Sequence, residues 1–167
     1  SDNINVTLLH SRLSIIDLNK RSNQPFVYND KILVFNGEIY NYLELKDHLI
    51  GKNYIFKTNS DTEVLIKLYD CYRENMFPYL EGMWAFAIWD ATATTLFLSR
   101  DRFGEKPLFY YHEGSRLAFA SSLAGLLPAL PNRDINPSAI ASLLSYEYIP
   151  TNECIYKGVK KLPPASN

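Results

Sequence analysis

The feature that most constrains the fold of this chain is a series of short apolar runs separated by turn signals and interrupted by three segments of helical period. Paired apolar runs flank Asn29-Asp30, residues 90–94 and Glu113-Gly114, and such pairs predict β-hairpins. Helical spacing of apolar residues occurs instead in 40–54, 58–75 and 135–150. Hairpins alternating with helices predict an α+β sandwich, with antiparallel sheets and helices on their outer faces.

Capping signals mark where each predicted helix begins. The residues at these starts are Asn41 with Glu44, Ser60 with Glu63, and Asn136 followed by Pro137. The first helix is expected to end at Gly51. Residues 5–18 are expected to form one or two strands with a bend near residues 10–12, and the run 83–90, apolar on both faces, predicts a strand covered on both sides.

The charge balance argues against several partners. The formal net charge is -1, and no run of Lys or Arg exceeds two residues, so neither nucleic acid nor a membrane surface is expected. The chain also contains no stretch of transmembrane length and no recognisable signal peptide. Two cysteines, Cys71 and Cys154, do not make a disulfide framework, which favours the cytoplasm, and Cys71 falls on an apolar helical stripe.

Metal and phosphate chemistry is not indicated. The three histidines have no metal-ligand spacing with one another or with the cysteines, so no metal site is expected. Gly-rich phosphate-binding patterns are absent as well. The ends of the chain, "SDNINV" and "LPPASN", suggest a fragment of a longer protein.

Asn36-Gly37 allows two interpretations. An Asn-Gly pair after an apolar run is a strong hairpin signal, but only residues 38–40 separate it from the next helix, too few for a good returning strand. The alternative is a side-chain amide and a backbone N–H directed at a substrate oxyanion, with glycine allowing close approach.

Charged residues in apolar surroundings extend this second interpretation. Arg12 interrupts an apolar run, and its guanidinium suits a carboxylate, although an edge-strand salt bridge would explain it too. Asp61 could receive an ammonium group or simply favour the helix dipole, and Glu38 could be solvated or face a ligand. Together these residues are compatible with a pocket for a zwitterionic amino acid.

Seven motifs give the chain a family resemblance. In order, they are HSRLSIIDL, FNGEIYNY, TNSDTEVLIKLY, LEGMWAFAIWD, SRDRFGEKPLFYY, LAFASS and IYKGVKKLPPA. This series, from residue 8 to residue 165, resembles the N-terminal glutaminase domain of glutamine-hydrolysing asparagine synthetases. Such domains are class II glutamine amidotransferases with the N-terminal-nucleophile hydrolase fold, so the resemblance implies a four-layer αββα sandwich.

The resemblance also implies a role for each site residue. Arg12 matches the arginine that binds the glutamine α-carboxylate, and Ile15 matches a position whose backbone holds the substrate. Asn36 and Gly37 match the oxyanion hole. Glu38 and Asp61 match contacts to the glutamine amino group.

The family nucleophile is a cysteine at the mature N-terminus, whose own α-amino group can act as the base. This chain begins with Ser1, so residues 1–165 are expected to be an N-terminally incomplete amidotransferase domain, inactive alone, and residues 166–167 the start of a linker. The resemblance implies no cofactor in this domain. ATP and Mg²⁺ are expected in a C-terminal synthetase domain that amidates aspartate.

Two alternatives remain open at this stage. One is a non-catalytic amidotransferase-like domain that serves as a binding or interaction module, and the other is an amidotransferase with a different acceptor. Glutamine and the synthetase domain of the same polypeptide are the expected partners, and a homodimer is left open.

Overall fold

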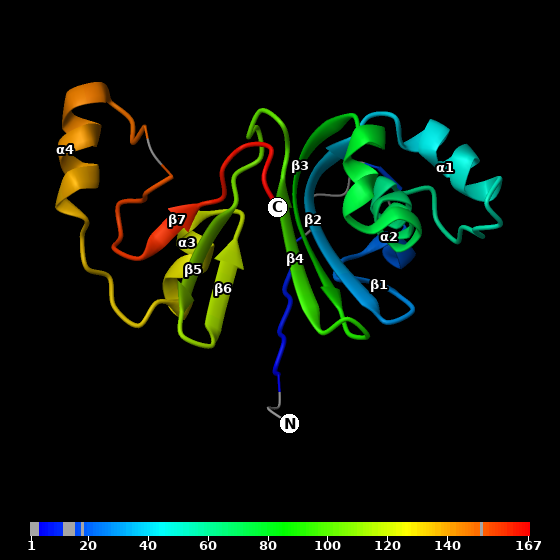
Figure 1. The fold of residues 1–167 in the computed structure, drawn as a ribbon, viewed down its shortest axis with the longest axis horizontal. Coiled ribbons are helices and arrows are strands. Elements are labelled where there is room, and N and C mark those ends of the chain that lie inside the picture. The colour runs from blue at the N-terminus through cyan, green and yellow to red at the C-terminus, as the bar shows by residue number, and fades with distance from the viewer. Residues whose placement is uncertain (1–3, 12–15, 18, 151) are drawn as a thin grey trace. The chain divides into compact units, whose positions relative to one another are not determined.

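The structure is a computed structural model that describes residues 4–11, 16–17, 19–150 and 152–167. Arg12 and Ile15, two of the predicted substrate-binding residues, lie outside the described residues. The chain divides into two compact units, Ser1–Leu98 and Ser99–Asn167. Each unit has its own sheet with helices beside it (Figure 1), which confirms the predicted α+β class.

The sheet of the first unit has the order β1-β2-β3-β4. Its strands are β1 (Phe26–Tyr28), β2 (Lys31–Ile39), β3 (Gly82–Asp90) and β4 (Thr95–Arg100). The predicted turn joins β1 to β2, where Asn29 has a φ of 52°. Strand β2 runs without a break opposite β3, with Asn36 facing Ala85 and Gly37 facing Trp84. The hairpin interpretation of Asn36-Gly37 is therefore wrong.

Helices α1 (Tyr42–Ile50) and α2 (Asp61–Tyr72), followed by the 3-10 helix η2 (Arg73–Tyr79), lie beside this sheet (Figure 1). Alternate residues of β2 enter the core they form, because successive side chains of a strand point to opposite faces. The main contributors from β2, α2 and β3 are Leu33, Phe35, Ile39, Val64, Leu65, Leu68, Trp84, Phe86 and Ile88. Cys71 packs against the same core, as predicted.

The predicted helix starts are correct, but two of the predicted capping bonds are not. Asn41 precedes α1, yet its side chain does not cap the helix. Its Nδ2 donates to Tyr79 O at 2.9 Å, and its Oδ1 accepts from Glu81 N at 3.2 Å, so it ties α1 to the segment before β3. Ser60 caps α2 by accepting from Thr62 N at 3.2 Å. Glu63 does not complete the capping box, because its carboxylate turns to the preceding loop.

A network of charged side chains links the start of β2 to the end of β3, where Lys31 Nζ lies 4.0 Å from Asp90 Oδ2. Lys31 is 3% exposed, and its Nζ lies 2.7 Å from Asp30 Oδ1 and 3.0 Å from Asp70 Oδ1. Arg73 pairs with the fully buried Asp90. Lys31 and Asp90 are buried, and the opposite charges around them offset the cost of removing these two groups from water.

The strand prediction for residues 5–18 is wrong where it can be examined. Residues 4–11 have no strand structure, and Ile4 and Leu9 are exposed by 58% and 85%. The neighbouring edge of β2 is already occupied there, since the side chain of Gln24 bonds both the N–H and the C=O of Phe35. Residues 4–11 therefore cannot hydrogen-bond to the backbone of Phe35 as a neighbouring strand would, although their sequence alternates as in a strand.

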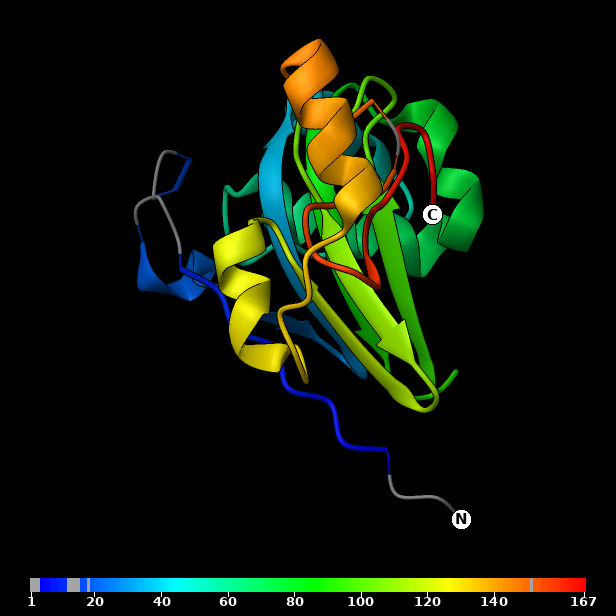
Figure 2. The same cartoon turned by 90° about the vertical axis from the view of Figure 1, so that its left-hand side faces the viewer.

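The second unit has a three-stranded antiparallel sheet with β5 at its centre. It contains β5 (Phe109–Glu113), β6 (Arg116–Ala120), β7 (Val159–Lys161), α3 (Leu123–Leu126), the 3-10 helix η3 (Leu127–Ala129) and α4 (Pro137–Tyr146). Figure 2 looks onto its helices, with α3 in yellow and α4 in orange. Asn136 caps α4 as predicted, accepting from Ser138 N at 3.2 Å.

No helix in the described part of the chain combines the length and the hydrophobicity that crossing a bilayer requires.

Candidate functional site

The candidate site lies along the edge of β2 that β1 leaves uncovered. Strand β1 pairs only with Lys31, Ile32 and Leu33, the first third of β2. Beyond it, Gln24 Oε1 accepts from Phe35 N at 2.6 Å, while Gln24 Nε2 donates to Phe35 O at 3.1 Å. The Gln24 carboxamide thus makes the pair of backbone hydrogen bonds, here called a rung, that a neighbouring strand would make with Phe35. His10 Nε2 also lies 3.0 Å from Phe35 O.

Asp61, the first residue of α2, occupies the same edge four residues further along β2. Its Oδ2 accepts from Ile39 N at 3.2 Å. In an antiparallel strand the N–H groups of alternate residues point to the same side. The N–H of Gly37 is therefore directed to this edge, between the rungs taken by Gln24 and Asp61.

Position 37 requires a glycine for two reasons, its backbone conformation and the atoms that surround it. Its φ is +154°, and an added Cβ would overlap Met83 O and lie 2.9 Å from Trp84 Cα. Gly82 on the facing strand has the reciprocal restriction, because its Cβ would overlap Glu38 O. Gly37 therefore allows a close approach to the backbone of β3, whereas the predicted approach to a substrate stays a prediction.

Asn36 and Glu38 flank Gly37 and are partly buried. Because Phe35 and Ile39 enter the core, alternation directs the side chains of Asn36 and Glu38 to the opposite face of the sheet. Of the six predicted site residues, Asn36, Gly37 and Glu38 are consecutive on β2, and Asp61 bonds the next residue of the strand, Ile39.

The Asp61 carboxyl group is an acid in a poorly solvated position. It is 5% exposed. Burial raises its pKa above the ordinary value of 3.8, and the backbone hydrogen bonds from Ile39 and Thr62 lower it only in part, while the charge of Glu38 raises it further. A cation bound here would favour the charged form and offset this cost.

The loop before α2, residues 55–60, is held from beneath by a buried pair that sequence reasoning did not assign. Glu63 and Lys67 are each 2% exposed, and Lys67 Nζ lies 2.6 Å from Glu63 Oε1. Their spacing of four residues on one helix was the available signal. Gln24 was also missed, because nothing in its local pattern distinguishes a strand-replacing amide from a surface glutamine.

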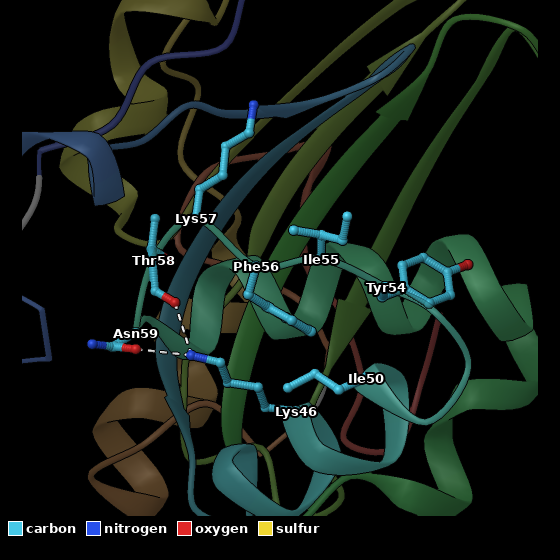
Figure 3. A pocket seen from close by; sticks show the side chains of 8 residues that line it. All are labelled: Lys46, Ile50, Tyr54, Ile55, Phe56, Lys57, Thr58 and Asn59. Atoms are coloured by element: carbon cyan, nitrogen blue, oxygen red, sulfur yellow. Dashed lines mark hydrogen bonds between the residues drawn. The ribbon is translucent and has the colours of Figure 1, made fainter.

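A shallow hollow of about 390 Å³ lies on the outer side of the same unit, between α1 and this loop (Figure 3). Its lining includes Lys46, whose Nζ donates to Thr58 O at 3.0 Å and to Asn59 Oδ1 at 2.8 Å. None of the four predicted site residues that the structure describes lines it. The hollow therefore shows how the loop is supported from α1, and it is distinct from the candidate site.

Cys71 is not placed to serve this site, and Cys154 is buried in the core of the second unit. Cys71 lies ten residues after Asp61 on α2, which at 1.5 Å per residue is roughly 15 Å. Cys154 belongs to the second unit, where it is 3% exposed in a cluster with Tyr111, Leu126 and Val159. Among the residues that the structure describes, no group of three or more His, Cys, Asp or Glu side chains could hold a metal ion.

The family model for the glutamine amidotransferase domain matches residues 1–167, and this chain belongs to that family. It is 41% identical over 157 residues to asparagine synthetase [glutamine-hydrolyzing] 1 of Bacillus subtilis, covering 93% of this chain and 25% of that protein. It is 38% identical over 189 residues to a putative asparagine synthetase [glutamine-hydrolyzing] 2 of Methanocaldococcus jannaschii, covering 99% of this chain and 35% of that protein. The chain thus spans about a quarter to a third of the length of these curated relatives.

A solved structure agrees with the sequence relatives. The glutamine phosphoribosylpyrophosphate amidotransferase from B. subtilis, complexed with ADP and GMP, has a TM-score of 0.61 and 26% identity, covering 76% of this chain and 30% of that chain. The family predicted from the seven motifs and its α+β fold class are confirmed.

Proposed function

We propose that this chain is the glutamine-hydrolysing domain of an asparagine synthetase and supplies ammonia for the amidation of aspartate. The observation that carries the proposal is a buried carboxylate, Asp61, on the same edge of β2 toward which the N–H of Gly37 is directed. The identities of 41% and 38% to asparagine synthetases support this acceptor over others.

In this proposal the charged ends of glutamine are bound separately. Asp61 and Glu38 receive the α-ammonium group, whose charge relieves the burial of the Asp61 carboxylate. Arg12 and the backbone of Ile15 receive the α-carboxylate. A hydrogen bond to a charged group contributes about 1.5–3 kcal/mol, so these contacts suffice to orient a small zwitterion.

The reacting carboxamide would lie at the Gly37 rung. When a cysteine thiolate attacks its carbon, negative charge develops on the carboxamide oxygen, and the N–H of Gly37 and the Nδ2 of Asn36 donate to it. An oxyanion donor of this kind contributes about 2.7–4 kcal/mol in the transition state. Ammonia leaves as the thioester forms, and water then releases glutamate and restores the thiol.

The nucleophile is proposed to come from polypeptide outside residues 1–167, because both cysteines of this chain have other positions. A terminal cysteine would supply its own base, since an α-amino group has a pKa near 7.7–8.0. Residues 1–167 alone are therefore expected to bind glutamine without hydrolysing it. ATP, Mg²⁺ and aspartate would be held by a synthetase domain of the same polypeptide, and two unpaired cysteines fit a reducing compartment such as the cytoplasm.

The test measures two activities of the complete polypeptide, glutamate release from glutamine and asparagine formation from free ammonia. Asn36→Ala is expected to lower kcat for glutamine hydrolysis by about 100-fold or more, since it removes an oxyanion donor. The ammonia-dependent activity of the same variant serves as the control and should be unchanged. Glutamine hydrolysis that persists at the wild-type rate in Asn36→Ala, or that is absent from the wild-type protein, would contradict the proposal.

A further inference from the structure

Glu63 lies beneath the loop that leads into the candidate site. Its Oε2 accepts from Thr58 N at 2.6 Å and from Thr58 Oγ1 at 2.7 Å, and its Oε1 accepts from Lys57 N at 3.0 Å. Lys67 completes the arrangement by pairing with Glu63 and donating to Ile55 O. Two buried side chains of α2 therefore set the backbone of residues 55–58.

This arrangement continues to Asp61 through hydroxyl groups. Thr58 Oγ1, which donates to Glu63, accepts from Ser60 N at 3.2 Å. Ser60 Oγ in turn lies 3.3 Å from Asp61 Oδ1. The other carboxylate oxygen of Asp61 accepts from Ile39 N, so the chain of bonds ends at the edge of β2. Thr58, Ser60, Asp61 and Glu63 are each at most 5% exposed, so water does not compete for these bonds.

The charges of the pair suit a permanent structural role. Burial raises the pKa of Glu63, but the hydrogen bonds from Lys67, Lys57 and Thr58 outweigh it and lower the pKa below the ordinary value. The Nζ of Lys67 lies 4.3 Å from the centre of the Phe56 ring and 5.0 Å from that of Tyr28. The ammonium is thus bounded by a carboxylate, a carbonyl and two aromatic faces.

We propose that Glu63, held by Lys67, is a positioning residue for substrate recognition: it fixes the loop 57–60 so that the Asp61 carboxylate faces the α-ammonium of an amino-acid substrate. This inference rests on the proposed function for the identity of that substrate. Glu63 does not touch glutamine in this account, and it acts only through Thr58, Ser60 and Asp61.

The test compares glutamine with 4-carbamoylbutanoate, which is glutamine without its α-amino group, as substrates of the complete polypeptide. The measured quantity is the ratio of kcat/KM for the two substrates, because a partly unfolded preparation lowers both values equally and leaves the ratio unchanged. Glu63→Gln replaces an acceptor oxygen by an NH₂ group facing backbone N–H donors. It is expected to lower the ratio about tenfold, mainly through a higher KM for glutamine, since a charged hydrogen bond is lost or misaligned.

Asp70→Asn is the matched control. Asp70 lies on the same helix, pairs with Lys31 at 3.0 Å and accepts from Tyr54 Oη at 3.0 Å, so the same carboxylate-to-amide change breaks an ion pair and a hydrogen bond away from the loop 57–60. Its substrate ratio should equal that of the wild-type protein. Thr58→Val, which removes only the hydroxyl between Glu63 and Ser60, should lower the ratio about threefold and serves if Glu63→Gln does not fold.

Equal ratios in the wild-type protein, Glu63→Gln and Thr58→Val would overturn the inference. A wild-type protein that does not discriminate between the two substrates would instead show that the proposed role of Asp61 is wrong. In that case the positioning role of Glu63 is tested without substrate, by measuring the amide hydrogen exchange of peptides covering residues 36–42 in the two variants. Faster exchange in Glu63→Gln than in Asp70→Asn supports the link from Glu63 to Ile39, and equal exchange overturns it.

Discussion

Replacement of Gly37 by alanine is expected to destabilise the first unit strongly, because two separate costs fall on one methyl group. The φ of +154° lies in a region that side-chain-bearing residues rarely adopt, and such strain costs about 1–3 kcal/mol. The new Cβ would also overlap Met83 O and lie 2.8 Å from Phe35 Cε2. Pushing apart a packed interior costs about 1–3 kcal/mol more.

The sum of these costs, about 2–6 kcal/mol, is a large part of the 5–15 kcal/mol that typically stabilises a domain. The facing strand β3 reports this change directly, because Gly37 lies opposite Trp84 in the ladder. Hydrogen exchange of peptides from β3 should become at least about thirtyfold faster, since each 1.4 kcal/mol corresponds to a factor of ten.

Gly51→Ala is the control for this experiment. Gly51 is in the same unit at a φ of -59°, and its nearest neighbour for an added Cβ is His48 O at 3.3 Å. Alanine is allowed there, so the change in stability should stay within about 1 kcal/mol. If Gly37→Ala exchanges no faster than Gly51→Ala, the argument from close approach and backbone strain is refuted.

Two further predictions concern pH. Burial raises the folded-state pKa of Asp61, so the wild-type protein loses stability as pH rises from below 3.8 through that raised pKa, whereas Asp61→Asn should not. The melting temperature of Asp61→Asn relative to wild type should therefore increase from pH 3 to pH 7, and a difference that stays constant or decreases over this range would contradict the argument. For Asp90, burial raises the pKa, but the bonds from Ala93 N and Arg73 lower it on balance. Its stabilisation is thus present above pH 3.8 and lost as pH falls through the lowered pKa, so Asp90→Asn should cost about 1–3 kcal/mol at pH 7 and much less in acid, measured by thermal unfolding at both pH values.

Local signals were sufficient for much of the secondary structure. The turn at Asn29-Asp30, the start of α2 after Ser60 and the cap of α4 at Asn136 each depend on a few neighbouring residues, and each was predicted correctly. The failures required knowledge of distant segments. The β-like pattern of residues 5–11 forms no strand, because Gln24 occupies the adjacent edge of β2.

The site was predictable to the extent that motifs name residue types. The motifs named Asn36, Gly37, Glu38 and Asp61, but they did not reveal that Asp61 bonds the backbone of Ile39, the residue after Glu38. The role of Glu63 was misjudged, because a capping box and a loop support need the same residue at the same position. Only the three-dimensional path of the loop distinguishes the two.

The short neighbour of β2 also has a consequence for association between molecules. An exposed strand edge invites pairing with strands of other chains, and such pairing needs several consecutive free rungs. Here the backbone groups of Phe35 and Ile39 on this edge are bonded by side chains of the same molecule. An edge interrupted at these two positions offers strands of other chains no long run of consecutive backbone groups, which disfavours aggregation through this edge.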